Sequence, residues 1–268
     1  MHATAQTEKR VKTKLPHPVL DALGIGFIVT SLAAATLLSG PPANAQDGPP
    51  GLVRKVEEQE TANEQARASY AYRQTLRVED FDPRGLRAGE YREVRDVIFL
   101  STGERTERLL GKPSSSLTRL RLTDEDFSDM RDVQPLLLTT DVAFLYETSY
   151  RGEETVDGIR CYVLRIQPRQ ILDGQRLFDG LIWIEPESYS IIRSEGRAVP
   201  EIHTRNSENL FPRFRTTRSK VDGKYWFPDL TSGDDVLEFR TGPQRMRLTI
   251  RYSNYQRFAA NSTITFDK

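Results

Sequence analysis

Carboxylates are the side chains of this sequence that could most readily do chemistry, and they gather in three clusters. The clusters are Asp124 to Asp126, Glu153 with Glu154, and Asp234 with Asp235. Two carboxylates across a cleft can hydrolyse a glycosidic bond, and several carboxylate oxygens together can bind calcium. The first cluster falls at a predicted helix start, where negative charge is favourable, and the others fall at predicted strand ends or turns. We therefore expect structural or solvated roles, and we keep an enzyme acting on glycans as an alternative.

Nucleophilic and metal-dependent catalysis have few residues to use. The sequence has one Cys, Cys161, and three His, of which only His203 lies beyond residue 45. It contains no Gly-x-Ser-x-Gly, no His-Glu-x-x-His and no glycine loop that could hold a phosphate. A catalytic His needs a nucleophile and a third group that orients it. We predict that Cys161 is a small buried hydrophobe, that His203 is exposed in a loop, and that the protein is no enzyme and holds no metal or cofactor.

The charged residues are balanced in number but not in type. There are 38 Lys+Arg and 38 Asp+Glu, and 30 of the cations are Arg. A zero net charge argues against a nucleic-acid partner bound through bulk positive potential. Arg245, Arg247 and Arg251 alternate with apolar residues along one predicted strand, where they could bind anions or a lipid head group. We interpret this stripe as a solvated strand face and keep the anion site as the alternative.

The first 45 residues predict an export signal. A basic opening (Lys9 to Lys14) precedes an uncharged apolar run, Ala22–Leu38, and a small-residue site at Ala43-Asn-Ala45. This order is that of a secretory signal peptide with cleavage after Ala45. At 17 residues the run is at the short end for a membrane span, so an uncleaved anchor is the alternative. Cleavage would leave a slightly acidic exported protein, residues 46–268.

Two helices are predicted in the remaining chain. After a Pro/Gly-rich leash, Leu52–Ser69 lacks Gly and Pro and carries a thin apolar stripe, which indicates a helix that covers something. Thr123-Asp-Glu-Asp126 resembles a capping box and opens a short helix before Pro135. Leu136–Leu138 and Val142–Tyr146 could form a second helical piece. We divide the chain into a signal peptide at 1–45, a leash and helix at 46–69, and one domain at 70–268.

The rest of the sequence has the two-residue period of β-strands. Turn residues such as Asp157-Gly158 and Asp222-Gly223 separate four successive hairpins. The predicted strands are Tyr70–Val78, Tyr91–Leu100, Arg105–Leu110, Phe144–Val156, Ile159–Gln167, Leu177–Glu185, Tyr189–Pro200, Phe214–Val221, Tyr225–Pro228, Val236–Arg240 and Arg245–Arg257. We predict an α+β protein with a single curved antiparallel sheet, a half-barrel of ten or eleven strands lidded by helices.

The facing of the strands indicates a partly covered sheet. Arg245 to Tyr252 alternates cleanly between apolar and polar, whereas Leu181 to Ile184 is apolar on both faces, so we expect the helices to cover the second face of such strands. If the sheet and its lid enclose a cavity, its expected lining is Phe99, Tyr162, Leu164, Trp183, Met246 and Leu248, with ordinary core packing as the alternative. The apolar pair Leu210 and Phe211, inside a polar loop, is either a lid or docking element or a loop anchored on the core.

Three segments carry a resemblance to a known family. Asp157–Pro168 (DGIRCYVLRIQP) and Phe178–Arg193 (FDGLIWIEPESYSIIR) together resemble the middle of the LolA-like family of periplasmic lipoprotein-sorting proteins. Asp222–Pro228 (DGKYWFP) is similar to an element of related exported proteins. The resemblance covers about Tyr70–Phe258 and is best over 157–228. It rests on turns and hairpins, so it concerns the fold more than an activity.

The resemblance implies a half-barrel with helices over an apolar cavity that shields acyl chains across the periplasm. Family members that carry lipids also use an Arg inside the cavity as a gate, and Arg77 and Arg95 lie on strands where one would fit. Some relatives instead sense envelope stress and bind regulatory proteins. We therefore expect a monomeric periplasmic carrier or binder of lipoprotein acyl chains or other lipids, with an outer-membrane acceptor or other envelope protein as a further partner. The alternative is a protein-binding sensor or regulator on the same fold.

Overall fold

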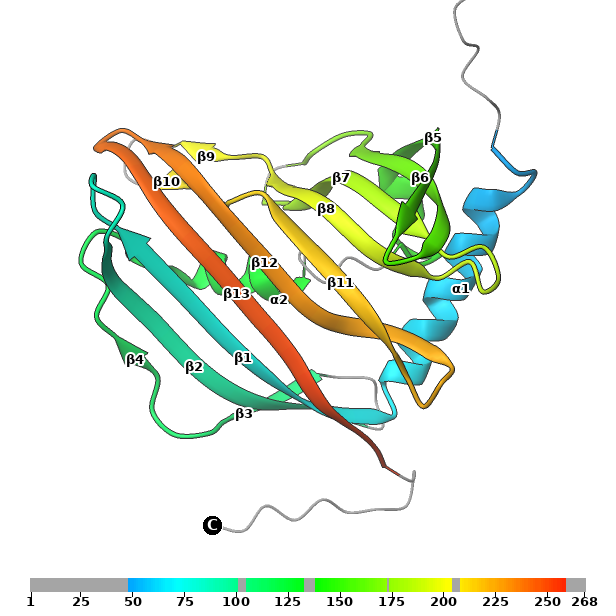
Figure 1. Ribbon diagram of the computed structural model, residues 1–268, viewed down its shortest axis with the longest axis horizontal. Coiled ribbons are helices and arrows are strands. Elements are labelled where there is room, and N and C mark those ends of the chain that lie inside the picture. Colours follow the sequence, from blue (N-terminus) through cyan, green and yellow to red (C-terminus); the bar gives the residue numbers. More distant parts are fainter. Residues whose placement is uncertain (1–47, 101–104, 133–137, 173, 204–207, 259–268) are drawn as a thin grey trace, which may run out of the picture. The chain divides into compact units, whose positions relative to one another are not determined.

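The computed structural model describes residues 48–100, 105–132, 138–172, 174–203 and 208–258. The predicted leader and its cleavage site lie outside these residues. Within them, two α-helices and one 3₁₀ turn accompany an eleven-stranded antiparallel sheet that curves without closing and a separate two-stranded ribbon (Figure 1). The predicted α+β class, with a single curved sheet of ten or eleven strands, is confirmed.

The elements follow one another in the order of the chain. They are α1 (Leu52–Arg67), β1 (Tyr70–Phe81), β2 (Arg87–Phe99), β3 (Arg105–Leu109), β4 (Ser114–Ser115), α2 (Asp124–Asp132), the 3₁₀ turn η1 (Ala143–Leu145), β5 (Tyr146–Val156), β6 (Ile159–Pro168), β7 (Leu177–Ile184), β8 (Ile191–Val199), β9 (Ile202–His203), β10 (Glu208–Asn209), β11 (Phe214–Val221), β12 (Tyr225–Phe239) and β13 (Gly242–Arg257).

The order of strands across the sheet decides where a cover must lie. It is β3-β2-β1-β13-β12-β11-β8-β7-β6-β5, with β4 beside β2. The chain therefore enters the sheet at β1, two strands in from the β3 edge, leaves it at that edge and re-enters it at the β5 edge. The connection between these edges has to cross one face of the sheet, and α2 lies on this connection (Figure 1).

Local sequence sets several of the turns. Asp157 and Gly158 have φ values of 49° and 83°, and Asp222 and Gly223 have 51° and 66°. Two successive residues with positive φ form the turn that matches the twist of a two-residue hairpin, and Asp-Gly pairs adopt it at low cost. These pairs fix the register of β5 with β6 and of β11 with β12.

Both helices pack on the same face of the sheet, which we call the inner face. The main core joins Val56 of α1 and Met130 of α2 to inner-face residues such as Leu76, Leu248 and Ile250. A second, smaller core lies on the opposite, outer face. It contains Val156, Cys161, Val163, Trp183, Ile192 and Trp226.

A buried ion pair fastens α1 to the sheet. Glu60 and Arg218 of β11 lie 2.9 Å apart, with side chains 0% and 3% exposed. The Ile191 amide and the Asn63 side chain also donate hydrogen bonds to Glu60. The thin apolar stripe of the sequence is thus supplemented by charge, and α1 covers the sheet as predicted.

The structure differs from the sequence prediction in strand β12, in the second helical piece and in the cover of β7, and the short strands β4, β9 and β10 were not predicted. The expected strands Tyr225–Pro228 and Val236–Arg240 are one strand, β12, because Pro228 sits at a register shift, where its missing N–H is tolerated. Of the second helical piece, Leu136 and Leu137 lie outside the described residues, and the part at Val142–Tyr146 is only the one-turn η1.

The third difference concerns the cover of β7. The helices cover its Ile182 and Ile184 side, whereas side chains cover Trp183, since Glu154 accepts its indole N–H and Arg193 stacks 4.3 Å from its ring.

Among the described residues, no helix is both long and apolar enough to span a bilayer.

Candidate functional site

An apolar cavity lies between the inner face of the sheet and the segments that cross it. Its free volume is about 40 Å³. The lining residues are Val78, Leu120, Arg121, Leu122, Asp126, Met130, Glu208, Leu210, Phe211, Leu237, Phe239, Met246 and Leu248. Ten of these thirteen are apolar, so the cavity suits a hydrocarbon better than a polar metabolite.

Three central strands form the floor. Val78 of β1, Leu237 of β12 and Met246 and Leu248 of β13 are all buried. Successive side chains of a strand alternate between its faces, so the inward set of β13 is the apolar one and the Arg side chains between them point outward. Continuous backbone pairing holds these three strands together, so the floor is a rigid surface.

The first covering segment is the loop that carries Leu120, Arg121 and Leu122. It makes no strand pairing with the sheet. Its anchor is Asp80 of β1, which is 0% exposed and accepts hydrogen bonds from the amides of Thr118 (3.2 Å) and Arg119 (3.0 Å). A carboxylate that accepts two backbone N–H groups holds a loop firmly at one point.

The second covering segment is α2. Thr123 and Asp126 form the predicted capping box, with the Thr123 amide donating to Asp126 over 2.6 Å and the Asp126 amide donating to Thr123 Oγ1 over 3.3 Å. Burial raises the pKa of the Asp126 carboxyl above its ordinary value, and neighbouring Asp129 adds to the rise, while the Thr123 hydrogen bonds and Arg176 oppose it. Asp129 is itself buried and pairs with Arg176 over 2.6 Å. This ion pair ties α2 to the loop before β7.

The third covering segment contains Leu210 and Phe211. Both side chains are 6% exposed and belong to the main core. The preceding Glu208 accepts the Arg240 amide at 3.1 Å and pairs with its guanidinium at 3.3 Å. Each of the three segments thus places apolar side chains over the floor and is fixed by a carboxylate near its end.

This arrangement can open without disrupting the sheet. A free volume of about 40 Å³ admits only a few water molecules, since each needs roughly 10–15 Å³. Pockets for drug-sized ligands have about 300–1,000 Å³. A chain-like ligand can therefore enter only if the cover moves away from the floor. The covering segments make no strand pairs with the eleven-stranded sheet, so they can move at lower cost than the paired strands of the floor.

The Asp80 anchor yields the first prediction. Replacing Asp80 with alanine removes both loop hydrogen bonds, so we expect a loss of about 2–3 kcal/mol in the free energy of unfolding and a looser loop. Trypsin should then cleave after Arg119 or Arg121 at least several-fold faster than in the parent protein. Asp82→Ala is the matched control, because Asp82 holds only its own turn through the amides of Arg84 and Leu86. Unchanged cleavage in Asp80→Ala would show that this carboxylate does not anchor the cover.

Four of the eight site residues expected from the sequence meet at this cavity. Met246 and Leu248 lie on its floor and Leu210 and Phe211 in its cover. Leu210 and Phe211 also belong to the main core. The pair is therefore both part of the cover and anchored on the core, the two roles that the sequence left as alternatives.

The other four lie elsewhere. Leu164 is buried in the main core, and Phe99 and Tyr162 pack at its margin, while Trp183 belongs to the outer-face core. Leu120, Leu122 and Met130 were missed, because nothing local distinguishes these apolar residues from ordinary loop or helix residues. They could have been predicted only from the connection that crosses the sheet, and this connection follows from the strand order.

The two candidate gating arginines lie on opposite faces. Arg77 is on the outer face and pairs with Glu90 at 2.8 Å. Arg95 lies opposite Gln74 on the inner side, pairs with Glu93 and Glu107, and is partly buried. The most deeply buried inner-face Arg paired with a carboxylate in the described part of the chain is Arg218, which the sequence did not single out.

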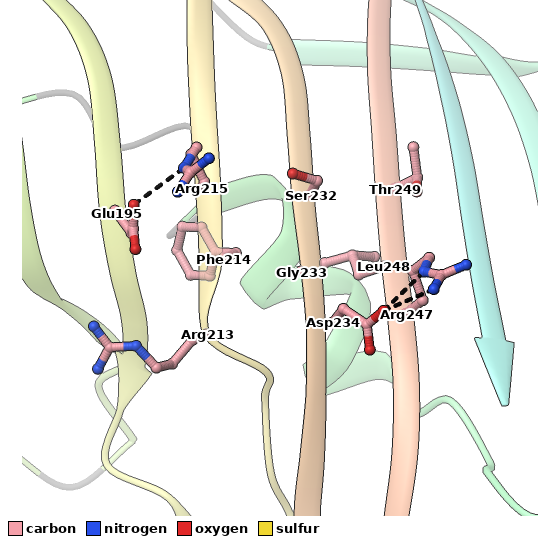
Figure 2. A pocket seen from close by; sticks show the side chains of 10 residues that line it. All are labelled: Glu195, Arg213, Phe214, Arg215, Ser232, Gly233, Asp234, Arg247, Leu248 and Thr249. Atoms are coloured by element: carbon pink, nitrogen blue, oxygen red, sulfur yellow. Dashed lines mark hydrogen bonds and ion pairs between the residues drawn. The ribbon is translucent and has the colours of Figure 1, made fainter. Parts of the chain in front are cut away.

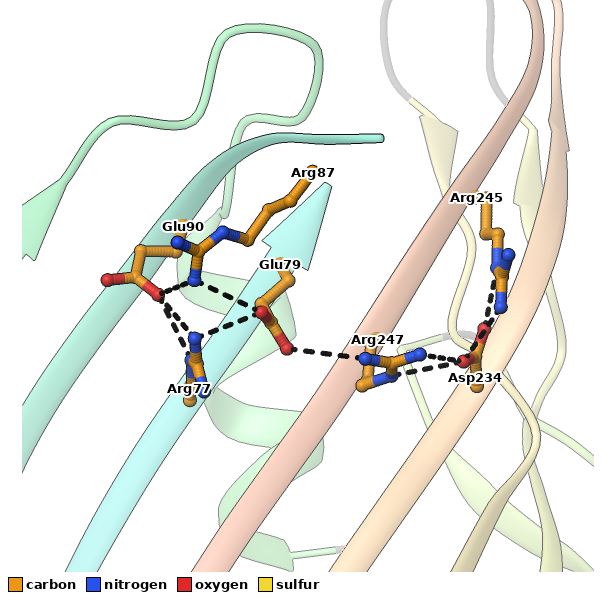
Figure 3. Close-up of polar contacts among 7 residues, drawn as sticks. All are labelled: Arg77, Glu79, Arg87, Glu90, Asp234, Arg245 and Arg247. Atoms are coloured by element: carbon orange, nitrogen blue, oxygen red, sulfur yellow. Dashed lines mark hydrogen bonds and ion pairs between the residues drawn. The ribbon is translucent and has the colours of Figure 1, made fainter. Parts of the chain in front are cut away.

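The outer face carries a ladder of ion pairs (Figure 3). Arg77, Arg87, Arg245 and Arg247 each lie within 3.0 Å of a carboxylate, and these carboxylates are Glu79, Glu90 and Asp234. The hydrogen bond from Arg245 is the main cause that holds the pKa of Asp234 below its usual range. The Arg stripe of β13 is thus largely neutralised within the sheet, as expected for a solvated strand face.

A second hollow opens on this outer face, between β11, β12 and β13 (Figure 2). It is a groove of about 330 Å³. Its walls carry Arg215 paired with Glu195 at 3.0 Å and Arg247 paired with Asp234 at 2.8 Å. Charged, mutually paired walls do not suit an apolar ligand, and Leu248 is the one residue that lines both this groove and the inner-face cavity.

The residues with catalytic potential do not converge. Asp126 caps α2, Glu154 binds Trp183, Asp234 pairs with two Arg, and the described residues contain no group of three potential metal ligands. Cys161 is buried, and burial raises the pKa of its thiol, which makes the thiolate scarcer. His203 is exposed as predicted, but it lies on strand β9 beside Glu208 and not in a loop, because the short β9–β10 pairing continues through it.

Fold and site together define a class: a curved antiparallel sheet whose inner face holds an apolar cavity under a crossing helical cover. No protein-family model and no curated protein match the chain. Solved structures do match, among them an outer membrane lipoprotein-sorting protein domain and a protein of the LolA superfamily, which the sequence motifs resemble.

Three of these structures illustrate the likeness. A putative outer membrane lipoprotein-sorting protein domain from Vibrio parahaemolyticus is 11% identical over 76% of this chain and 91% of that chain, with a TM-score of 0.38. A DUF1329 family protein from Desulfovibrio piger is 15% identical over 78% and 95%, with a TM-score of 0.37. A LolA superfamily protein from Nitrosomonas europaea is 11% identical over 77% and 94%, with a TM-score of 0.35. Scores this low carry no argument about function, which has to come from the geometry of this chain.

Proposed function

We propose that this protein binds the apolar chain of a lipid or lipoprotein between its sheet and the cover formed by α2 and its flanking segments. The observation that carries the proposal is the construction of the cavity. Its floor is a paired sheet, and its cover is apolar in the middle but fixed at its ends by the carboxylates Asp80, Asp129 and Glu208.

The energetics of such binding are favourable. Each buried CH₂ group contributes about 0.8 kcal/mol, so a chain of 12 to 14 carbons gains on the order of 10 kcal/mol. That gain can offset the separation of the cover from the floor. The apolar side chains of the cover would then contact the ligand in place of the floor.

We also propose that the protein acts after export, in the periplasm. The basic opening, the apolar run Ala22–Leu38 and the Ala43-Asn-Ala45 site support removal of a leader before the domain folds. A carrier of acyl chains is useful in an aqueous compartment between two membranes, where a free chain would aggregate. An outer-membrane acceptor or other envelope protein would then receive or deliver the ligand.

A protein-binding sensor remains the second candidate, and one observation favours it. Phe144 on η1 is 70% exposed, and Leu172 in the loop before β7 is 54% exposed. The Arg169 amide donates to the Leu145 carbonyl at 2.9 Å, so the two segments adjoin. Exposed apolar side chains are what a protein-docking surface needs, whereas a filled cavity is unnecessary for it.

The experiment that separates these functions is native mass spectrometry of protein purified without detergent, followed by displacement of a fluorescent fatty acid. We expect a co-purified mass in the range of lipids, or saturable binding of the fluorescent probe with one site per chain. Absence of both results would refute the carrier and leave the protein-binding function.

A further inference from the structure

The charged residues around the cavity differ in whether they already have a partner. Three of the thirteen lining residues are charged: Arg121, Asp126 and Glu208. Asp126 is satisfied by the Thr123 amide and hydroxyl, and Glu208 by Arg240 and His203. Arg121 makes no hydrogen bond or ion pair with any residue in the part of the chain that the structure describes.

Arg121 lies where the cavity meets solvent. It is exposed, whereas its neighbours Leu120 and Leu122 are half-buried and line the same cavity. A chain lying between the cover and the floor would therefore end near a guanidinium whose five N–H donors are uncommitted. Guanidinium groups favour carboxylate and phosphate oxygens, which they can bind through two parallel hydrogen bonds.

From this geometry we infer that the ligand is an anionic amphiphile, whose apolar chain lies in the cavity and whose carboxylate or phosphate head group binds Arg121. The inference rests on the proposed function, because it assigns the head group of the same ligand. The two carboxylates that line the cavity, Asp126 and Glu208, do not favour a cationic head group, since each already accepts hydrogen bonds within the protein.

The neighbouring Arg119 provides a matched control. It belongs to the same loop and is also exposed, but its Nε donates to Gln244 at 3.2 Å and it does not line the cavity. Arg119→Gln and Arg121→Gln therefore remove the same charge from the same loop, and only the second removes the proposed contact.

The test compares four probes that share a twelve-carbon chain, each below its micelle concentration: dodecanoate, dodecyl phosphate, dodecan-1-ol and dodecyltrimethylammonium. Isothermal titration with the folded parent protein should show the two anions binding about five- to tenfold more tightly than the alcohol, and the cation more weakly still. Arg121→Gln should abolish this preference, and Arg119→Gln should retain it. The preference should also shrink as salt rises, because a partly exposed ion pair is screened.

The outcomes separate the inference from the function beneath it. Equal affinity for all four probes, or an equal loss in both variants, would overturn the anionic head group and leave the apolar-chain function intact. No binding of any probe would overturn the proposed function itself. A tighter fit of dodecyl phosphate than of dodecanoate would assign the head group to a phospholipid-like source, and the reverse order to a fatty-acid-like source.

Discussion

Replacing Arg218 with methionine is expected to lower the free energy of unfolding by about 3–5 kcal/mol. Glu60, on the buried side of α1, is completely buried, and Arg218 is its counter-ion at 2.9 Å. Removing Arg218 leaves the Glu60 carboxylate buried without a counter-ion, with only the hydrogen bonds from Ile191 and Asn63, and this is the costly case. Urea unfolding followed by far-UV circular dichroism measures the effect.

The double variant Glu60→Leu with Arg218→Met distinguishes charge from packing. We expect it to regain most of the lost stability, because two apolar side chains can replace a buried ion pair at little cost. The surface pair of Arg54 and Glu58 is the control, since both side chains are more than half exposed and Arg54→Met should leave stability almost unchanged. A loss below about 1 kcal/mol in Arg218→Met would contradict the role assigned to this pair.

Shortening Phe211 to alanine should have opposite effects on stability and binding. The ring is buried in the main core and lines the cavity, so its removal should cost about 3–5 kcal/mol of stability. The vacated space enlarges a cavity that has only about 40 Å³. Since less of the cover then has to move, shorter chains such as octanoate should bind several-fold more tightly than in the parent protein.

Phe178→Ala is the matched control for this prediction. Phe178 is also buried in the main core, but it packs against Phe214 and does not line the cavity. It should lose a similar amount of stability and gain no affinity for octanoate. If both variants gain affinity equally, or if Phe211→Ala binds octanoate more weakly, the cavity beneath α2 is not the binding site.

The fold could largely be predicted from the sequence, because its signals are local. The inward and outward residues of β13 alternate along the strand, and Asp-Gly pairs with positive φ make the turns. The capping box at Thr123 marks the start of α2. The continuity of β12 could not be predicted, since Pro228 and a polar stretch imitate a loop and only pairing with both neighbours keeps the strand extended.

The site could be predicted only in part, because its position follows from strand order. The alternation of apolar and polar residues along β13 was enough to predict that Met246 and Leu248 point inward. The cover was not, because Leu120 and Met130 reach the cavity only through a connection between opposite edges of the sheet. Glu60 and Arg218 lie 158 positions apart, and neither residue type predicts burial by itself.

Methionine methyl groups test the central claim most directly. The sequence has three Met, and both of those beyond the predicted leader, Met130 in the cover and Met246 on the floor, line the cavity. In protein lacking residues 1–45 and labelled with ¹³C at the methionine methyl groups, titration with dodecanoate should shift both resonances together and saturably at one equivalent. Binding of dodecanoate that leaves both resonances unmoved would contradict the account, since the chain would then lie outside the space between α2 and the sheet.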